Sequence, residues 1–219
     1  MKLPLMPGNF GRRLSILTLL LTVAGGAATA GTISFSGNFN QDDDVWLMVV
    51  PLAAPSEVVL STSSFAAGGF APVLSVFDQS GLLLATDNDG GVGGCGPRPV
   101  DPATGFCWDA YLDLNLSAGN YLLALSEDDN KPYGPTYSDG FSRAGQGDFT
   151  GPAFLGQPGS FVLVTGAQRT SDFAVQVQTV PEPGTEILML GGLVGLLGLV
   201  RRTGGRASTR SLRSCINLQ

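Results

Sequence analysis

The residues of this chain that could do chemistry are mainly carboxylates, and many of them gather in three short clusters. The clusters are Asp42-Asp43-Asp44, Asp87-Asn88-Asp89 and Glu127-Asp128-Asp129-Asn130. Calcium prefers carboxylate and amide oxygens, roughly six to eight at a time. A structural calcium ion is therefore a candidate cofactor, and its first candidate ligands are Asp42, Asp44, Asp87, Asp89 and Asp128. The other interpretation is that Asp and Asn simply form turns and keep the surface soluble.

The chain contains no histidine, and this excludes several kinds of catalytic site. A Ser-His-Asp triad, a Cys-His pair and a His-ligated zinc centre all need an imidazole. Paired carboxylates could still hydrolyse a glycosidic bond, but no flanking pattern indicates a protected pocket. We therefore predict that the protein is not an enzyme. Trp46, Trp108 and Tyr111 could stack on sugars, although aromatic residues more often pack in a core or at its edge.

Charge is unevenly distributed along the chain. Residues 31–180 include 16 acidic and four basic residues, so this segment has a net charge of −12. Because such a segment repels phosphate backbones, we do not expect it to bind nucleic acid. It suits cations or neutral polar surfaces such as polysaccharides.

The acidic clusters lie at the ends of predicted β-strands. Between residues 31 and 180 the dominant hydrophobic period is two, as in Phe173, Val175 and Val177. We predict hairpins over 71–89, with a turn at 78–81, and over 110–128, with a turn at 117–120. Further strands are expected within 32–39, 44–50, 56–65 and 171–180, with a turn at 40–43.

This succession of strands predicts an all-β fold. Roughly seven to nine short strands indicate an antiparallel β-sandwich of jelly-roll type. We place this domain at residues 31–178. Residues 133–159 are rich in Gly, Pro, Ser and Asp, which is typical of a long surface loop. No segment in this part of the chain has the pattern of a soluble helix.

The first 30 residues have the three parts of a secretory signal peptide. Basic residues come first, an apolar stretch follows at 14–23, and Ala28 and Ala30 form a small-x-small cleavage signal. Cleavage there would start the mature chain at Gly31. The alternative, an N-terminal membrane anchor, is less well supported because the apolar stretch is short for a bilayer.

Export makes a disulfide bond the expected state of two cysteines. Cys95 and Cys107 lie in one Gly- and Pro-rich loop between predicted strands, and exported proteins commonly oxidise such pairs. A loop of this length would stabilise the fold by about 2–3 kcal/mol. The alternative is a pair of free thiols.

The C-terminal part also has three elements in order. Pro181-Glu182-Pro183 comes first, an apolar run covers 187–200, and Arg201-Arg202 follows directly. The apolar run predicts a short transmembrane helix that could insert with local thinning of the bilayer. The arginines would then lie on the cytoplasmic side, followed by a basic cytoplasmic tail at 203–219. An ordinary tail anchor would give the same topology.

Residues 179–202 with this three-part order resemble the PEP-CTERM sorting signal of bacterial exported proteins. The resemblance implies that the secretion machinery exports the chain and that exosortase, a membrane transpeptidase-like enzyme, recognises the signal. It also implies a protein anchored in the inner membrane before sorting, and located at the cell surface or in the extracellular matrix afterwards.

A second resemblance covers most of residues 33–180. The segments FSGNFNQDDDVWLMVV, GGFAPVLSVFDQSGLLLATDNDGG and WDAYLDLNLSAGNYLLALSEDDN occur in the order of a family of exported domains that carry this signal. That family is similar to the bacterial pre-peptidase C-terminal domain, a β-sandwich. The resemblance implies a fold and a location but no catalytic residues.

Together these patterns predict an exported structural or interaction protein of the cell surface or of the exopolysaccharide matrix of a biofilm. The alternative is a carbohydrate-binding module that depends on calcium. A hydrolase has less support, because the chain has no histidine and its sequence indicates no carboxylate pair in a protected cleft.

Overall fold

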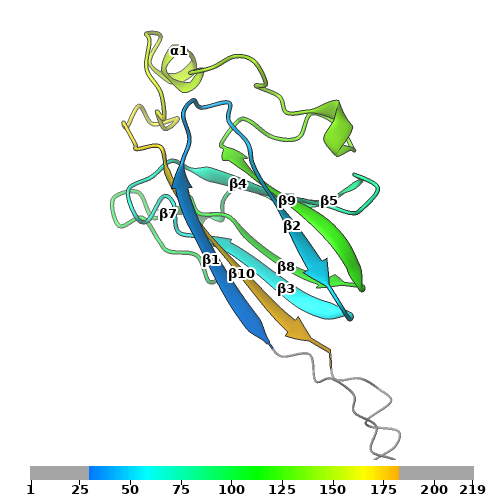
Figure 1. The fold of residues 1–219 in the computed structure, drawn as a ribbon. Coiled ribbons are helices and arrows are strands. Elements are labelled where there is room, and N and C mark those ends of the chain that lie inside the picture. Colours follow the sequence, from blue (N-terminus) through cyan, green and yellow to red (C-terminus); the bar gives the residue numbers. More distant parts are fainter. Residues whose placement is uncertain (1–29, 183–219) are drawn as a thin grey trace, which may run out of the picture.

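The computed structural model describes residues 30–182, which form two four-stranded β-sheets (Figure 1). All neighbouring strands in both sheets are antiparallel. The first sheet has the order β1 (Gly31–Asn38), β10 (Asp172–Pro181), β3 (Ser56–Thr62) and β8 (Tyr111–Leu116). The second sheet has the order β2 (Trp46–Leu52), β9 (Gly119–Glu127), β4 (Pro72–Phe77) and β5 (Leu83–Asp87).

Regular structure outside these sheets is short. A two-stranded ribbon pairs β6 (Gly91–Val92) with β7 (Phe106–Cys107). The described helices are a 3-10 turn, η1 (Tyr137–Asp139), and one α-helix, α1 (Thr150–Phe154). The prediction of an all-β fold is therefore confirmed. The predicted signal peptide, the helix at 187–200 and the basic tail lie outside the described residues, apart from Ala30.

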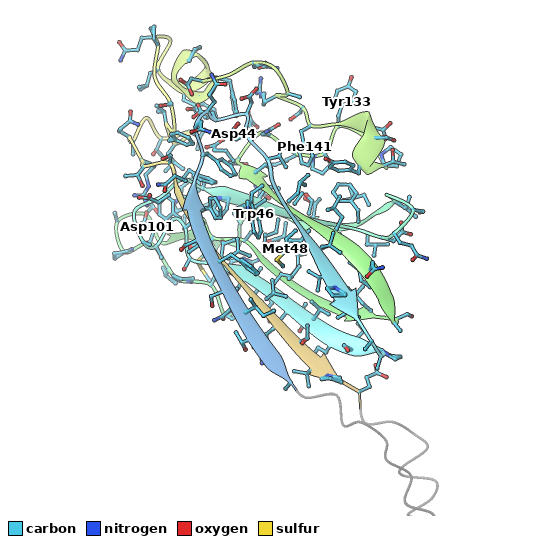
Figure 2. All side chains as sticks on the ribbon, viewed as in Figure 1. Asp44, Trp46, Met48, Asp101, Tyr133 and Phe141 are labelled. Atoms are coloured by element: carbon cyan, nitrogen blue, oxygen red, sulfur yellow. A yellow bond between two sulfur atoms is a disulfide. The ribbon has the colours of Figure 1, made fainter. Side chains whose placement is uncertain are left out.

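The core lies between the two sheets because each strand turns alternate apolar side chains inward. Trp46 and Met48 pack against this core from β2 (Figure 2). The main inward-facing residues of the first sheet are Val58, Leu60, Val175 and Val177. Those of the second sheet are Leu74, Val76, Leu123 and Leu125, in the same continuous cluster.

The hairpin predicted over 71–89 is confirmed. Strands β4 and β5 pair directly, and Asp78 closes the turn by accepting hydrogen bonds from the backbone N–H groups of Ser80 (2.8 Å) and Leu82 (2.9 Å). Gly81 adopts a φ of 86°, which favours glycine. The signals for this hairpin are local, so the sequence was sufficient to predict it.

The hairpin predicted over 110–128 is wrong. Strand β8 pairs with β3 in the first sheet, whereas β9 pairs with β2 and β4 in the second. Residues 117–118 therefore connect the two sheets. The alternation of apolar residues in both strands is real, but partners distant in sequence decide which sheet each strand joins.

Part of the long segment 133–159 covers the outer surface of the second sheet. Leu83 donates its N–H to the carbonyl of Pro135 (2.8 Å), and the ring of Tyr137 meets that of Phe77 edge to face, with centroids 5.7 Å apart. As a result β4 is buried on both faces. The first sheet, in contrast, exposes polar side chains on its outer face.

Strand β10 continues three residues past the predicted domain end at residue 178. Pro181 is paired with Ser56 of β3, and the N–H of Glu182 donates to the carbonyl of Pro55 (3.0 Å). The segment 179–181, where the sorting signal begins, is thus part of the sheet. Within residues 30–182 no helix has both the length and the apolar character needed to cross a membrane.

Candidate functional site

The long connections of the sandwich gather at one end, which we call the loop pole (Figure 1). It contains the β1–β2, β3–β4 and β9–β10 connections and the segment between β5 and β8. The predicted acidic clusters lie in these segments or at the strand ends beside them. The loop pole is therefore where a cation site was expected.

Asp42 is completely buried and links two distant segments of the loop pole. Its carboxylate accepts hydrogen bonds from the backbone N–H of Thr150 (2.8 Å), from the Thr150 hydroxyl and from the N–H of Phe161 (2.7 Å). Burial raises the pKa of Asp42, and these hydrogen bonds oppose that rise. The carboxylate fastens the β1–β2 connection to the segment that contains α1.

Asp44 acts as a turn former. Its Oδ2 accepts hydrogen bonds from the backbone N–H groups of Asn40 (2.6 Å) and Gln41 (3.1 Å). These contacts close the connection between β1 and β2. The carboxylates of Asp42 and Asp44 therefore serve different parts of the structure.

Asp87 forms an ion pair that organises the segment between β5 and β8. Its Oδ2 lies 2.7 Å from a guanidinium nitrogen of Arg98 and accepts a hydrogen bond from the N–H of Tyr111 (2.8 Å). The same guanidinium donates to the Tyr111 carbonyl (3.3 Å). The pair thus anchors the start of β8.

Asp89 and Asp128 are brought together by Asn88. The amide of Asn88 donates to Asp89 Oδ2 (2.7 Å) and to Asp128 Oδ1 (3.3 Å). Asp128 also lies 3.5 Å from the ammonium group of Lys131. Of the five predicted ligands, these two share a direct neighbour, and each is already engaged by donors of the chain.

Glu127 is the most unusual acidic residue of the loop pole, and sequence analysis did not select it individually. It lies on the same side of β9 as Leu123 and Leu125, so it points toward the core. Only 2% of the residue is exposed, and its Oε2 has no hydrogen-bond partner among the described residues. Burial, followed by the nearby charges of Asp128 and Asp42, raises its pKa well above the ordinary value. The period of two along β9 was the signal that could have identified it.

The acidic side chains do not converge on one point. Within residues 30–182, no three side chains of Asp, Glu or Cys are arranged to hold a metal ion. The observed contacts show carboxylates that order loops and anchor strands. Calcium binding therefore stays a prediction that these contacts do not test.

The three aromatic residues considered for sugar stacking do not form an exposed row. Trp46 packs between Phe35 and Phe173, with ring centroids 5.4 and 5.6 Å away. Trp108 is only 7% exposed and packs against other rings. Tyr111 is half-buried, and the Arg98 guanidinium lies 5.7 Å from its ring centroid. Packing explains the two tryptophans.

The outer face of the first sheet offers a different kind of surface. Ser34, Gln176, Ser61 and Tyr111 lie side by side on β1, β10, β3 and β8. A shallow hollow on this face is lined partly by Ser34, Ser61 and Gln176, whose side chains have no hydrogen-bond partner within residues 30–182. These neutral hydroxyl and amide groups can donate to and accept from a polar ligand.

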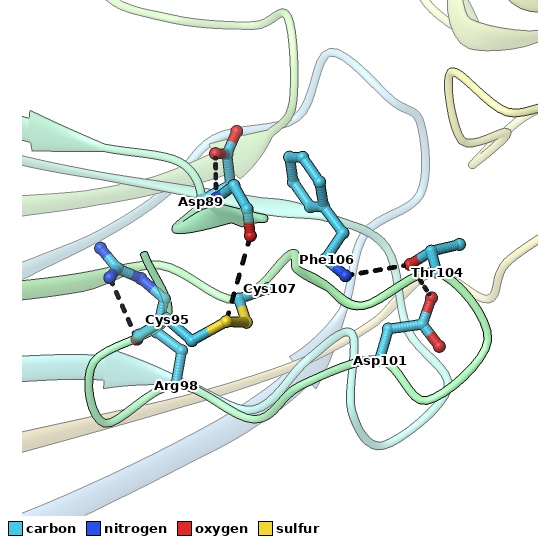
Figure 3. The surroundings of a disulfide bond; sticks show 8 residues. Asp89, Cys95, Arg98, Asp101, Thr104, Phe106 and Cys107 are labelled. Atoms are coloured by element: carbon cyan, nitrogen blue, oxygen red, sulfur yellow. Dashed lines mark hydrogen bonds between the residues drawn. A yellow bond between two sulfur atoms is a disulfide. The ribbon is translucent and has the colours of Figure 1, made fainter. Parts of the chain in front are cut away.

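The structure joins Cys95 and Cys107 by a disulfide bond (Figure 3). Their Cα atoms are 5.5 Å apart. The N–H of Gly90 also donates to the carbonyl of Cys107 (2.8 Å). The disulfide thus secures the β6–β7 ribbon at the loop pole.

The sorting residues lie at the opposite end of the sandwich. Pro181 ends β10, and Glu182 directly after it is exposed. Pro183, Arg201 and Arg202 lie outside the described residues, as does Ala28. Ala30 directly precedes β1.

Comparison with known families identifies this end of the chain. Residues 179–206 match the PEP-CTERM protein-sorting motif. None of the curated proteins matches the chain. The motif supports an exported protein that is transiently anchored in the membrane and processed by exosortase.

We predict that Asp42→Ala destabilises the domain by about 3 kcal/mol, because two buried backbone N–H groups and one hydroxyl lose their acceptor. Chemical denaturation of the purified protein measures the change. Asp43→Ala is the matched control, because the Asp43 carboxylate is neither fully buried nor part of this network, and it should cost less than about 0.5 kcal/mol. Equal losses in the two variants would contradict a special role for Asp42.

We predict that Glu127→Gln becomes more stabilising as pH rises. The raised pKa means that ionisation of Glu127 disfavours the folded state, so the wild type loses stability from about pH 4.5 upward until the pH passes the folded-state pKa. Melting temperatures of both proteins at about pH 4 and about pH 8 measure the difference. Glu57→Gln, on the exposed side of β3, controls for the loss of one charge. A gap between Glu127→Gln and the wild type that is the same at both pH values would refute this interpretation.

Proposed function

We propose that this protein is a structural or interaction component of the bacterial cell surface or of the exopolysaccharide matrix, and that it is not an enzyme. The observation that supports the proposal most directly is the sorting motif at residues 179–206, which begins within the last strand of the sandwich. A small acidic domain fused to such a signal is a cargo whose role depends on where it is delivered. Localisation in the matrix of a biofilm is the specific form of this proposal.

The contacts of the acidic residues support a non-catalytic role. A glycosidase needs two carboxylates that flank a sugar and are free to exchange protons or attack. Here Asp42, Asp44 and Asp87 are occupied by backbone donors or by an arginine. Glu127 is buried and faces the core. We infer that these residues stabilise the domain.

We further infer a jelly-roll topology for the sandwich. Among its eight main strands, six of the seven consecutive connections pass from one sheet to the other, and only β4 and β5 are consecutive neighbours within a sheet. Two such four-stranded sheets are typical of jelly rolls. This topology also fits the proposed relationship to exported domains similar to the pre-peptidase C-terminal domain.

Carbohydrate binding is the second candidate, and the outer face of the first sheet favours it. The row formed by Ser34, Gln176 and Ser61 has hydroxyl and amide groups without partners in the described part of the chain. The four basic residues of the domain engage loop-pole groups. A neutral polysaccharide therefore suits this face better than an anionic one. The proposed dependence on calcium would act through the loop pole.

We predict that Glu182→Ala leaves uncleaved protein in the membrane, because the variant removes the carboxylate of the Pro-Glu-Pro element of the sorting motif. Immunoblotting of membrane and extracellular fractions, with tags on both sides of the motif, measures cleavage and release. Asp113→Ala is the control, because it removes one exposed carboxylate from β8 and leaves the motif intact. Normal release of Glu182→Ala would contradict sorting through this motif.

We predict that the secreted protein co-sediments with a neutral polysaccharide and that Ser61→Asp combined with Gln176→Ala abolishes this binding. The double variant places a charge in the row and removes an amide from it. Sedimentation with and without EDTA, beside a melting curve, also tests the predicted calcium. Asp148→Asn, in the β9–β10 connection, is the control for a change of charge elsewhere. Equal sedimentation of the double variant and the wild type would exclude this face, and a melt unchanged by EDTA would exclude structural calcium.

A further inference from the structure

The end of the sandwich opposite the loop pole is where strand β1 begins and strand β10 ends (Figure 1). Gly31 is paired with Thr179, and Ser56 is paired with Pro181. We call this end the terminal pole and define it by Gly31, residues 53–55, residues 117–118 and residues 180–182. Gly31, the first residue after the predicted signal-peptidase site, and the start of the sorting motif therefore lie on adjacent strands at one end of the domain.

The two poles differ strongly in loop length and charge. At the terminal pole three residues connect β2 to β3 and two connect β8 to β9. Glu182 is the one charged residue in the set that defines this pole. The loop pole, in contrast, contains the acidic clusters and the ion pairs of Arg98, Lys131 and Arg143. The terminal pole therefore has shorter loops and fewer charges than the loop pole, with the exposed Glu57 beside it, paired with Val180.

The start of the sorting motif is part of the folded domain at this pole. Strand β10 lies between β1 and β3, and its last residue, Pro181, is paired with Ser56. The N–H of Glu182 donates to the Pro55 carbonyl (3.0 Å). Any protein that binds the Glu182 side chain in this conformation must approach Pro55 and the exposed Ala53 beside it.

We propose that the terminal pole is a docking surface for exosortase, which engages Pro181 and Glu182 as the end of a folded strand together with the turn at residues 53–55. This inference rests on the proposed sorting function and adds a second recognition element, provided by the domain. The geometry fits a membrane-embedded partner, because the segments preceding Gly31 and following Glu182 carry the predicted membrane signals.

The test compares the same substitution at two alanines, one at the terminal pole and one at the loop pole. Ala53→Glu places a charge on the exposed turn beside Pro55, and Ala103→Glu makes the same change in an exposed loop between Cys95 and Cys107. Both variants are made in the full-length chain with tags on both sides of the motif. Pulse-chase labelling in the native host measures the rate of C-terminal cleavage, and melting curves of the secreted forms check folding.

The proposal expects Ala53→Glu to slow C-terminal cleavage about tenfold, as for the loss of one important interface contact. Ala103→Glu should be cleaved at the wild-type rate. The melting temperature of Ala53→Glu should equal that of the wild type. Cleavage of Ala53→Glu at the wild-type rate would overturn the docking surface, as would slowing that Ala103→Glu shares. Glu182→Ala distinguishes failure of the sorting function from failure of the docking surface. Normal C-terminal cleavage of Glu182→Ala would refute the sorting function itself. Blocked cleavage of Glu182→Ala together with normal cleavage of Ala53→Glu would refute only the docking surface.

Discussion

The position of β10 between β1 and β3 is the constraint on which the rest of the structure depends. The first sheet cannot close without this strand, because β1 has β10 as its pairing partner and β3 reaches β1 only through it. The same strand supplies Phe173, Val175 and Val177 to the core. Its two-sided pairing also places both ends of the domain together, since Gly31 is opposite Thr179. The placement of this one strand thus completes the core and brings the first and last strands of the domain to the same end.

Carboxylates give the loop pole its order. Asp42 connects segments more than 100 residues apart in the chain, whereas Asp44 closes a local turn and Asp87 anchors β8 through Arg98. A small second apolar cluster, formed by Ala71, Trp108 and Leu163, lies among the same loops, and directional hydrogen bonds to charged acceptors add to the order that it provides. The acidity of the domain, which in sequence resembled a set of metal ligands, is in this structure largely an internal framework of hydrogen bonds. The row of Ser34, Gln176 and Ser61 on the outer face of the first sheet has no part in this framework.

Sequence analysis succeeded where the determining signals are local. The alternation of apolar residues located the main strands, and the Asp78 turn located the β4–β5 hairpin. The prediction failed for β8 and β9, because the two residues between them look like a hairpin turn. Their partners, β3 and β2, lie 50 or more residues away in sequence. The burial of Asp42 was equally hidden, since Thr150 and Phe161 supply its donors. Glu127 was accessible in principle, because counting by two from Leu123 places it toward the core. Strand β10 ends at Pro181, one residue beyond the strand expected within 171–180, and a proline is tolerated where a strand ends.

The distance in sequence between β1 and β10 has a consequence for the order of events during export. The secretion machinery delivers a chain from its N-terminus, so β1 emerges first and its partner emerges last, about 140 residues later. Until β10 arrives, β1 is without its partner and the inward side chains of β3 lack their neighbour in the sheet. A chain truncated before residue 172 therefore lacks both the strand that closes the first sheet and the sorting motif. The strand that completes the first sheet and the sorting motif are thus encoded in one contiguous segment, 172–206, so that one truncation removes both.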